Sequence, residues 1–259
     1  MKFQLICADP PWFFSDKLNM SNIKRGASSH YKTLSLEDLK KLDVESISKD
    51  NAILALWVPS SLLQDGLDVM NAWGFKQKQV AVWVKTKKSP LYSLLKEIRT
   101  TKRRIKSGLH MVDIKDVSSL FSKFDINKNI LQFFMGHLFR SCHELVLIGV
   151  RGSLYSKMKD KSQRSVFMAP NAKHSAKPEI LQDKLDSVFP DLSKIELFSR
   201  RQRPGWVCIG NEAPMSKDED IFNSIKKLKL VSNSAEKDIL AAANANQKEQ
   251  LSKIWKEIK

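Results

Sequence analysis

The segment FQLICADPPW, at residues 3–12, decides the fold of this chain. Its first six residues, Phe3 to Ala8, form a short apolar run of the kind that is buried on both faces of a parallel sheet. Asp9 and two prolines end the run, so residues 9–12 lie at the carboxyl end of the expected strand. Ligands bind at that end of the strands in open α/β sheets. The segment therefore predicts a parallel sheet and the edge at which its functional site lies.

Further short apolar runs alternate with segments of helical period along the chain. This alternation predicts an α/β fold with a Rossmann-like, mostly parallel sheet of about seven strands. We expect Ser35 and Ser60 to cap two helices, and Pro178 to lie in the first turn of a third. The expected strands are 3–8, 52–58, 79–84, 145–150, 165–168, 194–198 and 206–209, and the expected helices are 35–42, 60–73 and 178–189.

Positive charge is concentrated in two stretches of a chain whose formal net charge is +16. Residues 86–130 hold 11 Lys and Arg against 4 Asp and Glu, and residues 151–177 hold 7 against 1. Such clustering predicts contacts with nucleic-acid phosphates, the alternative being a role in solubility alone. Because residues 86–130 also interrupt the alternation of strands and helices, we interpret them as a basic insertion that faces the substrate. Arg103 and Arg104 are its expected phosphate contacts.

The remaining composition narrows the class of protein. No apolar run approaches the roughly 18 residues of a membrane span, and the first residues lack the features of a secretory signal. We therefore expect an intracellular protein with no membrane contact, in the cytoplasm, nucleoid or nucleus, or in the host cytoplasm if a phage encodes it. Cys7, Cys142 and Cys208 are expected to be reduced thiols, and the five histidines show no metal-ligand spacing, so no metal site is predicted.

The chain is expected to divide near residue 212. Residues 1–212 contain all the expected strands, and residues 213–259 are strongly charged, with apolar positions at helical spacing through Leu251, Ile254 and Ile258. We interpret the first part as a single domain and the second as a helical tail. The tail could pack on the domain, pair with a partner, or fray.

Several motifs resemble those of the MT-A seventy family of adenine methyltransferases, in the permuted β-class order that places DPPW before the main cofactor-binding segments. The resemblance covers most of residues 1–212 and is to the compact bacterial and phage members. It implies a methyl transfer from S-adenosylmethionine to the 6-amino group of adenine. Besides DPPW, the similar segments are SSHYKTLSLEDLKKL, LWV, WVKT, a Gly-His pair followed by Glu144, Lys177-Pro178-Glu179, IELFSRR and GWVCIGNE.

The DPPW motif has a chemical interpretation in such a reaction. The lone pair of an aromatic amine is delocalised into the ring, so the enzyme must localise it on the nitrogen. The Asp9 carboxylate and the Pro10 carbonyl can accept the two amino hydrogens, while Pro11 keeps the turn rigid. The base is then expected to lie between Trp12 and Tyr31, after extrusion from a duplex or capture from a single strand.

The resemblance also implies binding residues later in the chain. Several of these residues also have a purely structural interpretation. Lys177 and Arg203 could be surface charges, Asn211 and Glu212 could form a simple turn, and Glu144 could cap a strand. Gln202 stands where some relatives have His, and the basic insertion is longer than the usual loop. The implied contacts are Glu144 with the substrate, Lys177 with the cofactor's methionine carboxylate, Arg200, Gln202 and Arg203 with the ribose side, and Asn211 and Glu212 with the ribose and adenine side.

The sequence therefore predicts an S-adenosylmethionine-dependent DNA adenine methyltransferase. DNA is favoured over RNA because the resemblance is to the compact bacterial and phage type, and RNA adenine methylation is the first alternative. A non-catalytic nucleic-acid-binding subunit and a cytosine 4-amino methyltransferase are the others. The enzyme could act alone, as a homodimer or with a second methyltransferase subunit, and the motifs do not specify a recognition sequence.

Overall fold

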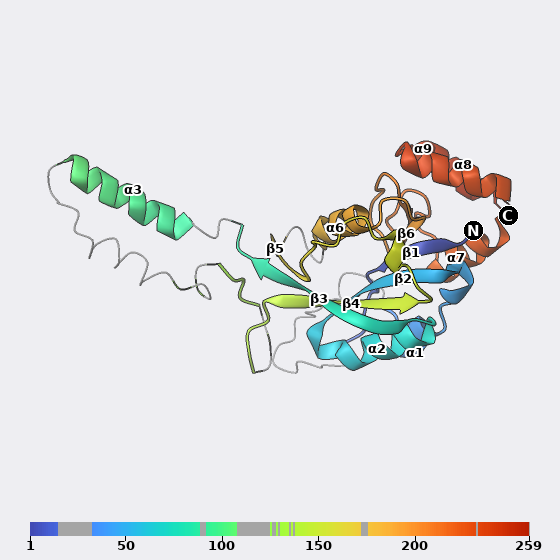
Figure 1. Cartoon of the computed structure of the whole chain (residues 1–259), viewed down its shortest axis with the longest axis horizontal. Coiled ribbons are helices and arrows are strands. Elements are labelled where there is room, and N and C mark those ends of the chain that lie inside the picture. The colour runs from blue at the N-terminus through green and yellow to red at the C-terminus, as the bar shows by residue number, and fades with distance from the viewer. Residues whose placement is uncertain are drawn as a thin grey trace. The chain divides into compact units, whose positions relative to one another are not determined.

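The computed structural model describes residues 1–14, 33–88, 92–107, 125, 128, 130–134, 136, 138–171, 176–231 and 233–258, with the backbone alone at 92–94, 97, 101, 104 and 105. In these parts of the chain, seven strands form one sheet in the order β5-β3-β4-β2-β1-β6-β7 (Figure 1). The strands are β1 (Phe3–Ala8), β2 (Ser48–Val58), β3 (Lys76–Thr86), β4 (His143–Arg151), β5 (Val166–Pro170), β6 (Lys194–Leu197) and β7 (Val207–Ile209).

The sheet is mostly parallel, as predicted. Strand β1 pairs in parallel with β2 and β6, β6 pairs in parallel with β7, and β3 pairs in parallel with β5. Strand β4 runs antiparallel to β2. Every side chain of β1 except that of Gln4 is buried, which explains why the run FQLICA has no polar alternation. The α/β fold class is therefore confirmed.

All seven predicted strands are present, although their ends differ by a few residues. Strands β2 and β3 begin earlier than predicted. Their first residues, SKDN in β2 and KQK in β3, are largely polar and exposed. A search for apolar runs cannot include such residues. The helices and 3-10 turns are α1 (Leu36–Lys40), η2 (Glu45–Ile47), η3 (Ser60–Leu62), α2 (Leu63–Ala72), α3 (Tyr92–Lys106), η4 (Tyr155–Lys157), α6 (Ile180–Val188), α7 (Ile221–Leu230), α8 (Asn233–Asn244) and α9 (Lys248–Glu257).

Of the predicted helix starts, one is confirmed and two are wrong. The Ser35 hydroxyl accepts a hydrogen bond from the Asp38 N–H and caps α1, as predicted. Ser60 does not cap α2, because the chain enters that helix through the 3-10 turn η3 and neither start has a side-chain cap. Pro178 precedes α6 rather than lying in its first turn, since the helix begins at Ile180.

The contacts divide the chain into two compact units. Unit 1 contains residues 1–81, 145–163 and 182–259, and unit 2 contains residues 82–144 and 164–181. By sequence, unit 2 holds 16 Lys and Arg against 6 Asp and Glu, so it carries +10 of the chain's net +16. The smaller unit is therefore the strongly basic one.

The last helices pack into the core of unit 1. The apolar cluster that contains the central strands also includes Leu228 of α7, Ile239 of α8, and Leu251 and Trp255 of α9. Ile254 and Ile258 are partly buried against the same cluster. Of the three arrangements open for residues 213–259, packing on the domain is the one observed, and the predicted boundary at residue 212 is not a break in the packing.

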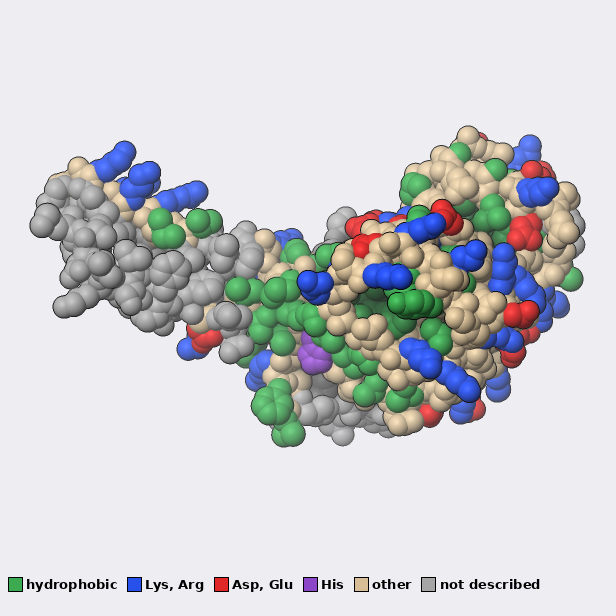
Figure 2. Space-filling view, viewed as in Figure 1, with side chains coloured by type: hydrophobic (Ala, Val, Ile, Leu, Met, Phe, Trp, Pro, Cys, Tyr) green, Lys and Arg blue, Asp and Glu red, His purple; other side chains and the backbone are tan. Residues whose placement is uncertain are grey.

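The basic insertion contains a helix that the sequence analysis did not predict. Helix α3 exposes the apolar side chains of Leu95 and Ile98, at 47% and 42% of their surface, beside exposed cations such as Lys96 and Arg103. Figure 2 shows blue cationic and green apolar side chains along the helix that Figure 1 labels α3. The apolar positions fall at helical spacing, but the many charges of KEIRTTKRRIK obscure that period. Among the described residues, no helix combines the length and apolar character that crossing a membrane requires.

Candidate active site

Three neighbouring strands of unit 1 bring several of the predicted site residues to one edge of the sheet. In the register of the parallel strands, Ala8 is opposite Leu197, and Leu197 is opposite Ile209. Asp9, Arg200 and the pair Asn211-Glu212 follow these strand ends, so they share the edge that the sequence predicted. The Arg200 Nε atom lies 3.7 Å from Glu212 Oε1, which joins two of the expected cofactor residues directly.

Hydrogen bonds fix the DPPW turn after β1. The Trp12 N–H donates to the Pro10 carbonyl at 2.9 Å, and the Leu34 N–H donates to the Pro11 carbonyl at 3.0 Å. Pro10 is buried and Asp9 is partly exposed. The Pro10 oxygen keeps a second lone pair, because a carbonyl can accept two hydrogen bonds. The turn therefore holds an acceptor carbonyl and a reachable carboxylate on a rigid backbone.

Trp12 is an anchor of this turn in the described structure. Its side chain is only 6% exposed and belongs to the apolar core, and its indole N–H donates to the Trp57 carbonyl at 2.9 Å. The aromatic side chains that are exposed beside the motif are Phe13, at 54%, and Phe14, at 44%. The sequence analysis missed these two residues, although two aromatics directly after the motif were a visible signal. Stacking of the base on Trp12 stays a prediction.

The loops after β6 and β7 approach each other closely. A Cβ atom added to Gly210 would lie 2.3 Å from the Ser199 carbonyl oxygen, so only glycine fits there. Phe198 has a φ of 62°, a left-handed conformation that is strained for a bulky residue. Gln202 is 8% exposed, and its Nε2 donates to the Trp206 carbonyl at 2.8 Å, while its Oε1 is buried without a hydrogen-bond partner. A buried acceptor without a partner fits a ligand that carries hydroxyl donors.

Arg203 is already engaged by two carboxylates of α6. Its Nη2 lies 2.7 Å from Asp183 Oδ1 and 2.9 Å from Asp186 Oδ2. The guanidinium is 13% exposed. These contacts give Arg203 a structural role in unit 1, and its contact with the ribose side of a cofactor stays a prediction.

Glu196 of β6 is a partly buried acid beside the strand that precedes DPPW, and the sequence analysis did not single it out. It is opposite Cys7 of β1 and Cys208 of β7, and its Oε1 accepts a hydrogen bond from Gln182 Nε2 at 3.1 Å. Burial raises the pKa of Glu196 to about 7, with Arg201 opposing the shift and Asp9 adding to it. Burial also raises the pKa of the Cys208 thiol to about 12. A glutamate within the apolar strand KIEL was the available sequence signal.

The raised pKa of Glu196 predicts a pH-dependent stability. Between about pH 4.5, its ordinary pKa, and about pH 7, the unfolded chain releases this proton while the folded chain keeps it. Stability should therefore fall as the pH rises through this window, by roughly 3 kcal/mol in total. In Glu196→Gln this loss should disappear. The free energy of unfolding of the variant, measured with urea, should therefore rise relative to that of the wild type between pH 4.5 and 8. Glu37→Gln controls for the removal of one negative charge, and a constant difference between Glu196→Gln and the wild type would contradict the prediction.

In unit 2, Glu144 joins two lysines. Its Oε1 lies 2.6 Å from Lys85 Nζ and its Oε2 lies 3.3 Å from Lys177 Nζ. Burial alone would raise the pKa of Glu144, but the charges and hydrogen bonds of Lys177 and Lys85 lower it below the ordinary value. The Lys85 ammonium also lies 5.0 Å from the centre of the Phe134 ring. Two predicted residues, Glu144 and Lys177, are therefore in contact.

Lys85 is a candidate site residue that the sequence analysis missed. The available sequence signal for Lys85 was a lysine that directly follows the apolar run VAVWV. Arg103 is exposed on α3, whereas Tyr31 and the side chain of Arg104 lie outside the described residues. Asn211 and Glu212 are exposed after β7, where the sequence placed them.

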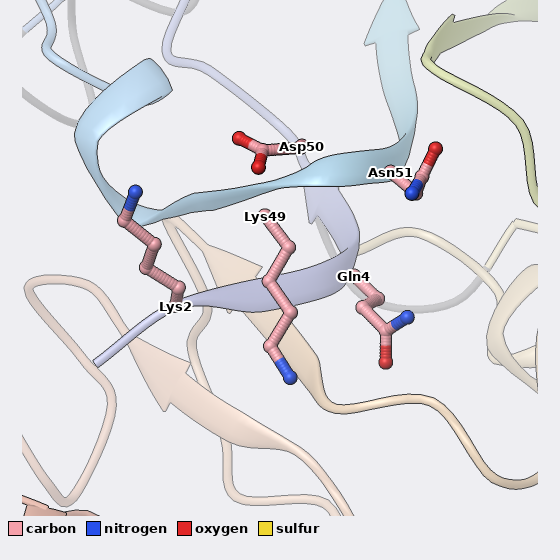
Figure 3. A pocket seen from close by; sticks show the side chains of 5 residues that line it. All are labelled: Lys2, Gln4, Lys49, Asp50 and Asn51. Atoms are coloured by element: carbon pink, nitrogen blue, oxygen red, sulfur yellow. The ribbon is translucent and has the colours of Figure 1, made fainter.

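A polar hollow of about 300 Å³ lies at the opposite ends of β1 and β2 from the DPPW turn. Figure 3 shows its lining side chains, which come from the early residues of these two strands and from Lys2, directly before β1. They include none of the predicted site residues, so this hollow provides control positions for experiments on the site. Its lining residues are Lys2, Gln4, Lys49, Asp50 and Asn51.

Comparison with known proteins identifies relatives along most of the chain. The MT-A70 family model matches residues 3–135 and 118–212. The Type II methyltransferase M.MunI of a Mycoplasma species is 28% identical over 233 residues, which are 84% of this chain and 81% of that protein. The human N(6)-adenosine-methyltransferase catalytic subunit METTL3 is 24% identical over 82% of this chain, and an MT-A70-like N(6)-adenosine-methyltransferase of Arabidopsis thaliana is 24% identical over 81%. The aligned region spans only 28% and 24% of those two longer proteins.

Proposed function

Because the chain belongs to the MT-A70 family of methyltransferases, we propose that it transfers a methyl group from S-adenosylmethionine to the 6-amino group of adenine in DNA. The observation that carries this proposal is the position of Asp9 on the rigid turn after β1, beside the strand ends that precede Arg200 and Glu212. A carboxylate at that edge can accept a hydrogen bond from an amine that lies next to a bound cofactor. DNA is favoured because the chain aligns along most of a compact bacterial methyltransferase, and along about a quarter of the eukaryotic ones.

Asp9 orients the amine in the proposed reaction. Its carboxylate accepts one amino hydrogen and the second lone pair of the Pro10 carbonyl accepts the other, which draws the nitrogen towards tetrahedral geometry. The same negative charge stabilises the positive charge that develops on the nitrogen. No general base is needed, because the methylated ammonium can lose its proton to water. Trp12 holds this turn against the core, and we expect the base to contact aromatic side chains beside it.

S-adenosylmethionine supplies an electrophilic methyl group when it is bound. The buried Oε1 of Gln202, which has no hydrogen-bond partner in the described structure, fits a ribose that donates hydroxyl hydrogens. Arg200, Arg203, Asn211 and Glu212 are the other residues proposed to line the ribose and adenine side. Lys177 is proposed to meet the methionine carboxylate, and its contact with Glu144 would keep the ammonium in a defined position.

The first test identifies the modified nucleoside. Purified protein is incubated with labelled S-adenosylmethionine and with matched unmethylated DNA and RNA, and the digested nucleosides are identified by mass spectrometry. We expect 6-methyladenine from DNA alone. 6-Methyladenine from RNA alone would overturn the DNA assignment, and 4-methylcytosine would overturn the choice of base.

A non-catalytic subunit is the second candidate, because the human relative is named as the catalytic subunit of a methyltransferase. Calorimetry with S-adenosylmethionine separates the two candidates, since a subunit that has lost catalysis should not bind the cofactor. Cofactor binding without any methylated base would indicate that a partner is missing. Light scattering then tells whether the protein is a monomer or a homodimer.

The basic insertion makes a separate prediction about binding. Reversing the charge at Arg103 and Arg104 should weaken binding to DNA and reduce the slope of log K against log salt by about 2, because each phosphate contact releases counterions. Binding is measured by fluorescence anisotropy at several salt concentrations. The control reverses Lys2 and Lys49, which are exposed at the polar hollow. An unchanged slope in the Arg103 and Arg104 variant would show that the insertion does not contact phosphates.

A further inference from the structure

The three most exposed large apolar side chains in the described chain lie close together in the sequence of unit 2. They are Leu138, at 93%, Phe139, at 87%, and Phe133, at 73%. The Arg140 guanidinium lies over the Phe133 ring, 5.0 Å from its centre. These four residues are called the apolar tip below. Large apolar side chains grouped in this way on a surface mark an interaction site.

A tight turn holds the apolar tip. The Phe134 N–H donates to the Ser141 carbonyl at 3.2 Å, and the two residues form an antiparallel bridge that closes the turn. A Cβ atom added to Gly136 would lie 2.1 Å from the Phe139 carbonyl oxygen, so the backbone passes too closely there for any other residue. The bridge therefore brackets Leu138, Phe139 and Arg140, and Phe133 directly precedes it.

The same turn is bonded to the strand that carries Lys85. The Gln132 N–H donates to the Lys85 carbonyl at 2.9 Å, and the Lys85 N–H donates to the Cys142 carbonyl at 2.8 Å. The Lys85 ammonium binds Glu144. The apolar tip is thus built on the backbone that positions Glu144, a residue expected on the substrate side of the reaction.

The charge of unit 2 indicates what kind of partner the apolar tip contacts. The unit carries a net charge of +10, and the tip itself contains Arg140. The cores of protein interfaces are depleted in charge, whereas interfaces with nucleic acids combine cations on phosphates with apolar or aromatic groups on bases. A polyanion with exposed base faces therefore fits this surface better than a second protein does.

We propose that the apolar tip inserts into duplex DNA as a wedge and stacks on the bases that flank the target adenine. This inference rests on the proposed function and specifies how its substrate is opened. An adenine must leave the stack before its amino group can react, and unstacking costs a few kcal/mol. Apolar side chains that fill the gap offset this cost, as in other proteins that unstack a base step.

The test compares a paired and a mispaired substrate. The double variant Leu138→Ala/Phe139→Ala is assayed on a duplex that the wild type methylates, and on the same duplex with a mismatch at the methylated adenine. We expect kcat/KM to fall roughly 10- to 100-fold on the paired duplex, and less than about threefold on the mispaired one, whose adenine is already unstacked. The control, Leu63→Ala/Leu230→Ala, removes side chains of unit 1 that are 40% and 66% exposed, and should leave both rates unchanged.

Fluorescence of 2-aminopurine, placed at adenine positions in duplexes of mixed sequence, reports unstacking without requiring transfer. Its rise on binding should be large for the wild type and small for the double variant. Equal losses of kcat/KM on the two substrates would overturn the wedge. Unchanged rates together with a change in oligomeric state would also overturn it, and would assign the tip to contacts with a second copy of the chain. If the wild type methylates no nucleic acid, the proposed function fails, and the fluorescence still decides whether the tip opens a duplex.

Discussion

The rate of methyl transfer in Asp9→Ala is expected to be lower than in the wild type by on the order of 10³-fold or more, while the affinity for S-adenosylmethionine falls only modestly. The loss follows from the role of the carboxylate, which localises the amine lone pair and stabilises charge that exists only in the transition state. The backbone of the turn should survive the change, because the bonds that hold it join main-chain atoms and the Trp12 indole. Single-turnover rates and calorimetric affinities measure the two effects separately.

Two further variants make the Asp9 prediction specific. Asp9→Asn keeps the size of the side chain and one acceptor oxygen, so it should retain more activity than Asp9→Ala and far less than the wild type. Asp50→Ala removes an exposed carboxylate at the polar hollow, and should behave as the wild type. Turnover in Asp9→Ala within tenfold of the wild type would refute the assignment of DPPW as the catalytic motif.

The fold was predictable because its signal is local. Each strand of a parallel sheet is buried along its length, so apolar runs such as FQLICA reveal the strands without knowledge of their neighbours. The position of Asp9 at the carboxyl edge of the sheet followed from the same run, because a residue directly after a parallel strand lies at that edge. The helix α3 was missed because its apolar period is short and its charges dominate the composition.

The contacts within the site were not predictable, because they depend on residues far apart in the sequence. Lys85, Glu144 and Lys177 lie on separate segments, and only the folded unit brings the three charges together. The burial of Trp12 depends on Trp57, which supplies the carbonyl for its indole. A motif therefore predicts which residues act, while the packing decides which side chains remain exposed.

The packing of the last helices illustrates the same limit on the scale of the whole chain. Residues 213–259 read as a charged tail, yet Leu251 and Trp255 are buried in the core of unit 1. Helical spacing of apolar residues predicts a helix with one buried face, but it does not say which surface covers that face. For this reason the sequence analysis left three arrangements open.

Asp186→Ala is expected to reduce the free energy of unfolding by about 3–5 kcal/mol. Asp186 of α6 accepts hydrogen bonds from Lys194 Nζ at 2.7 Å, from the Trp206 indole at 3.0 Å and from Arg203 Nη2 at 2.9 Å. The Lys194 side chain is 7% exposed and Trp206 is fully buried. Removal of the carboxylate would leave a buried ammonium without its counter-charge and a buried indole N–H without an acceptor, and each of these costs free energy.

Asp183 provides the matched control for this prediction. It lies one turn earlier on the same helix and also binds Arg203, at 2.7 Å, but its side chain is 63% exposed. Because solvent screens an exposed ion pair, Asp183→Ala should cost less than about 1 kcal/mol. Urea unfolding of the two variants and the wild type at one pH gives the comparison. Similar losses of unfolding free energy in both variants would mean that the ion pairs at Arg203 account for the stabilisation. The contacts of Asp186 with buried Lys194 and Trp206 would then contribute little. A large loss for Asp186→Ala alone would show that the carboxylate anchors the start of β6 and the residue before β7, the two strands whose ends carry the proposed cofactor residues.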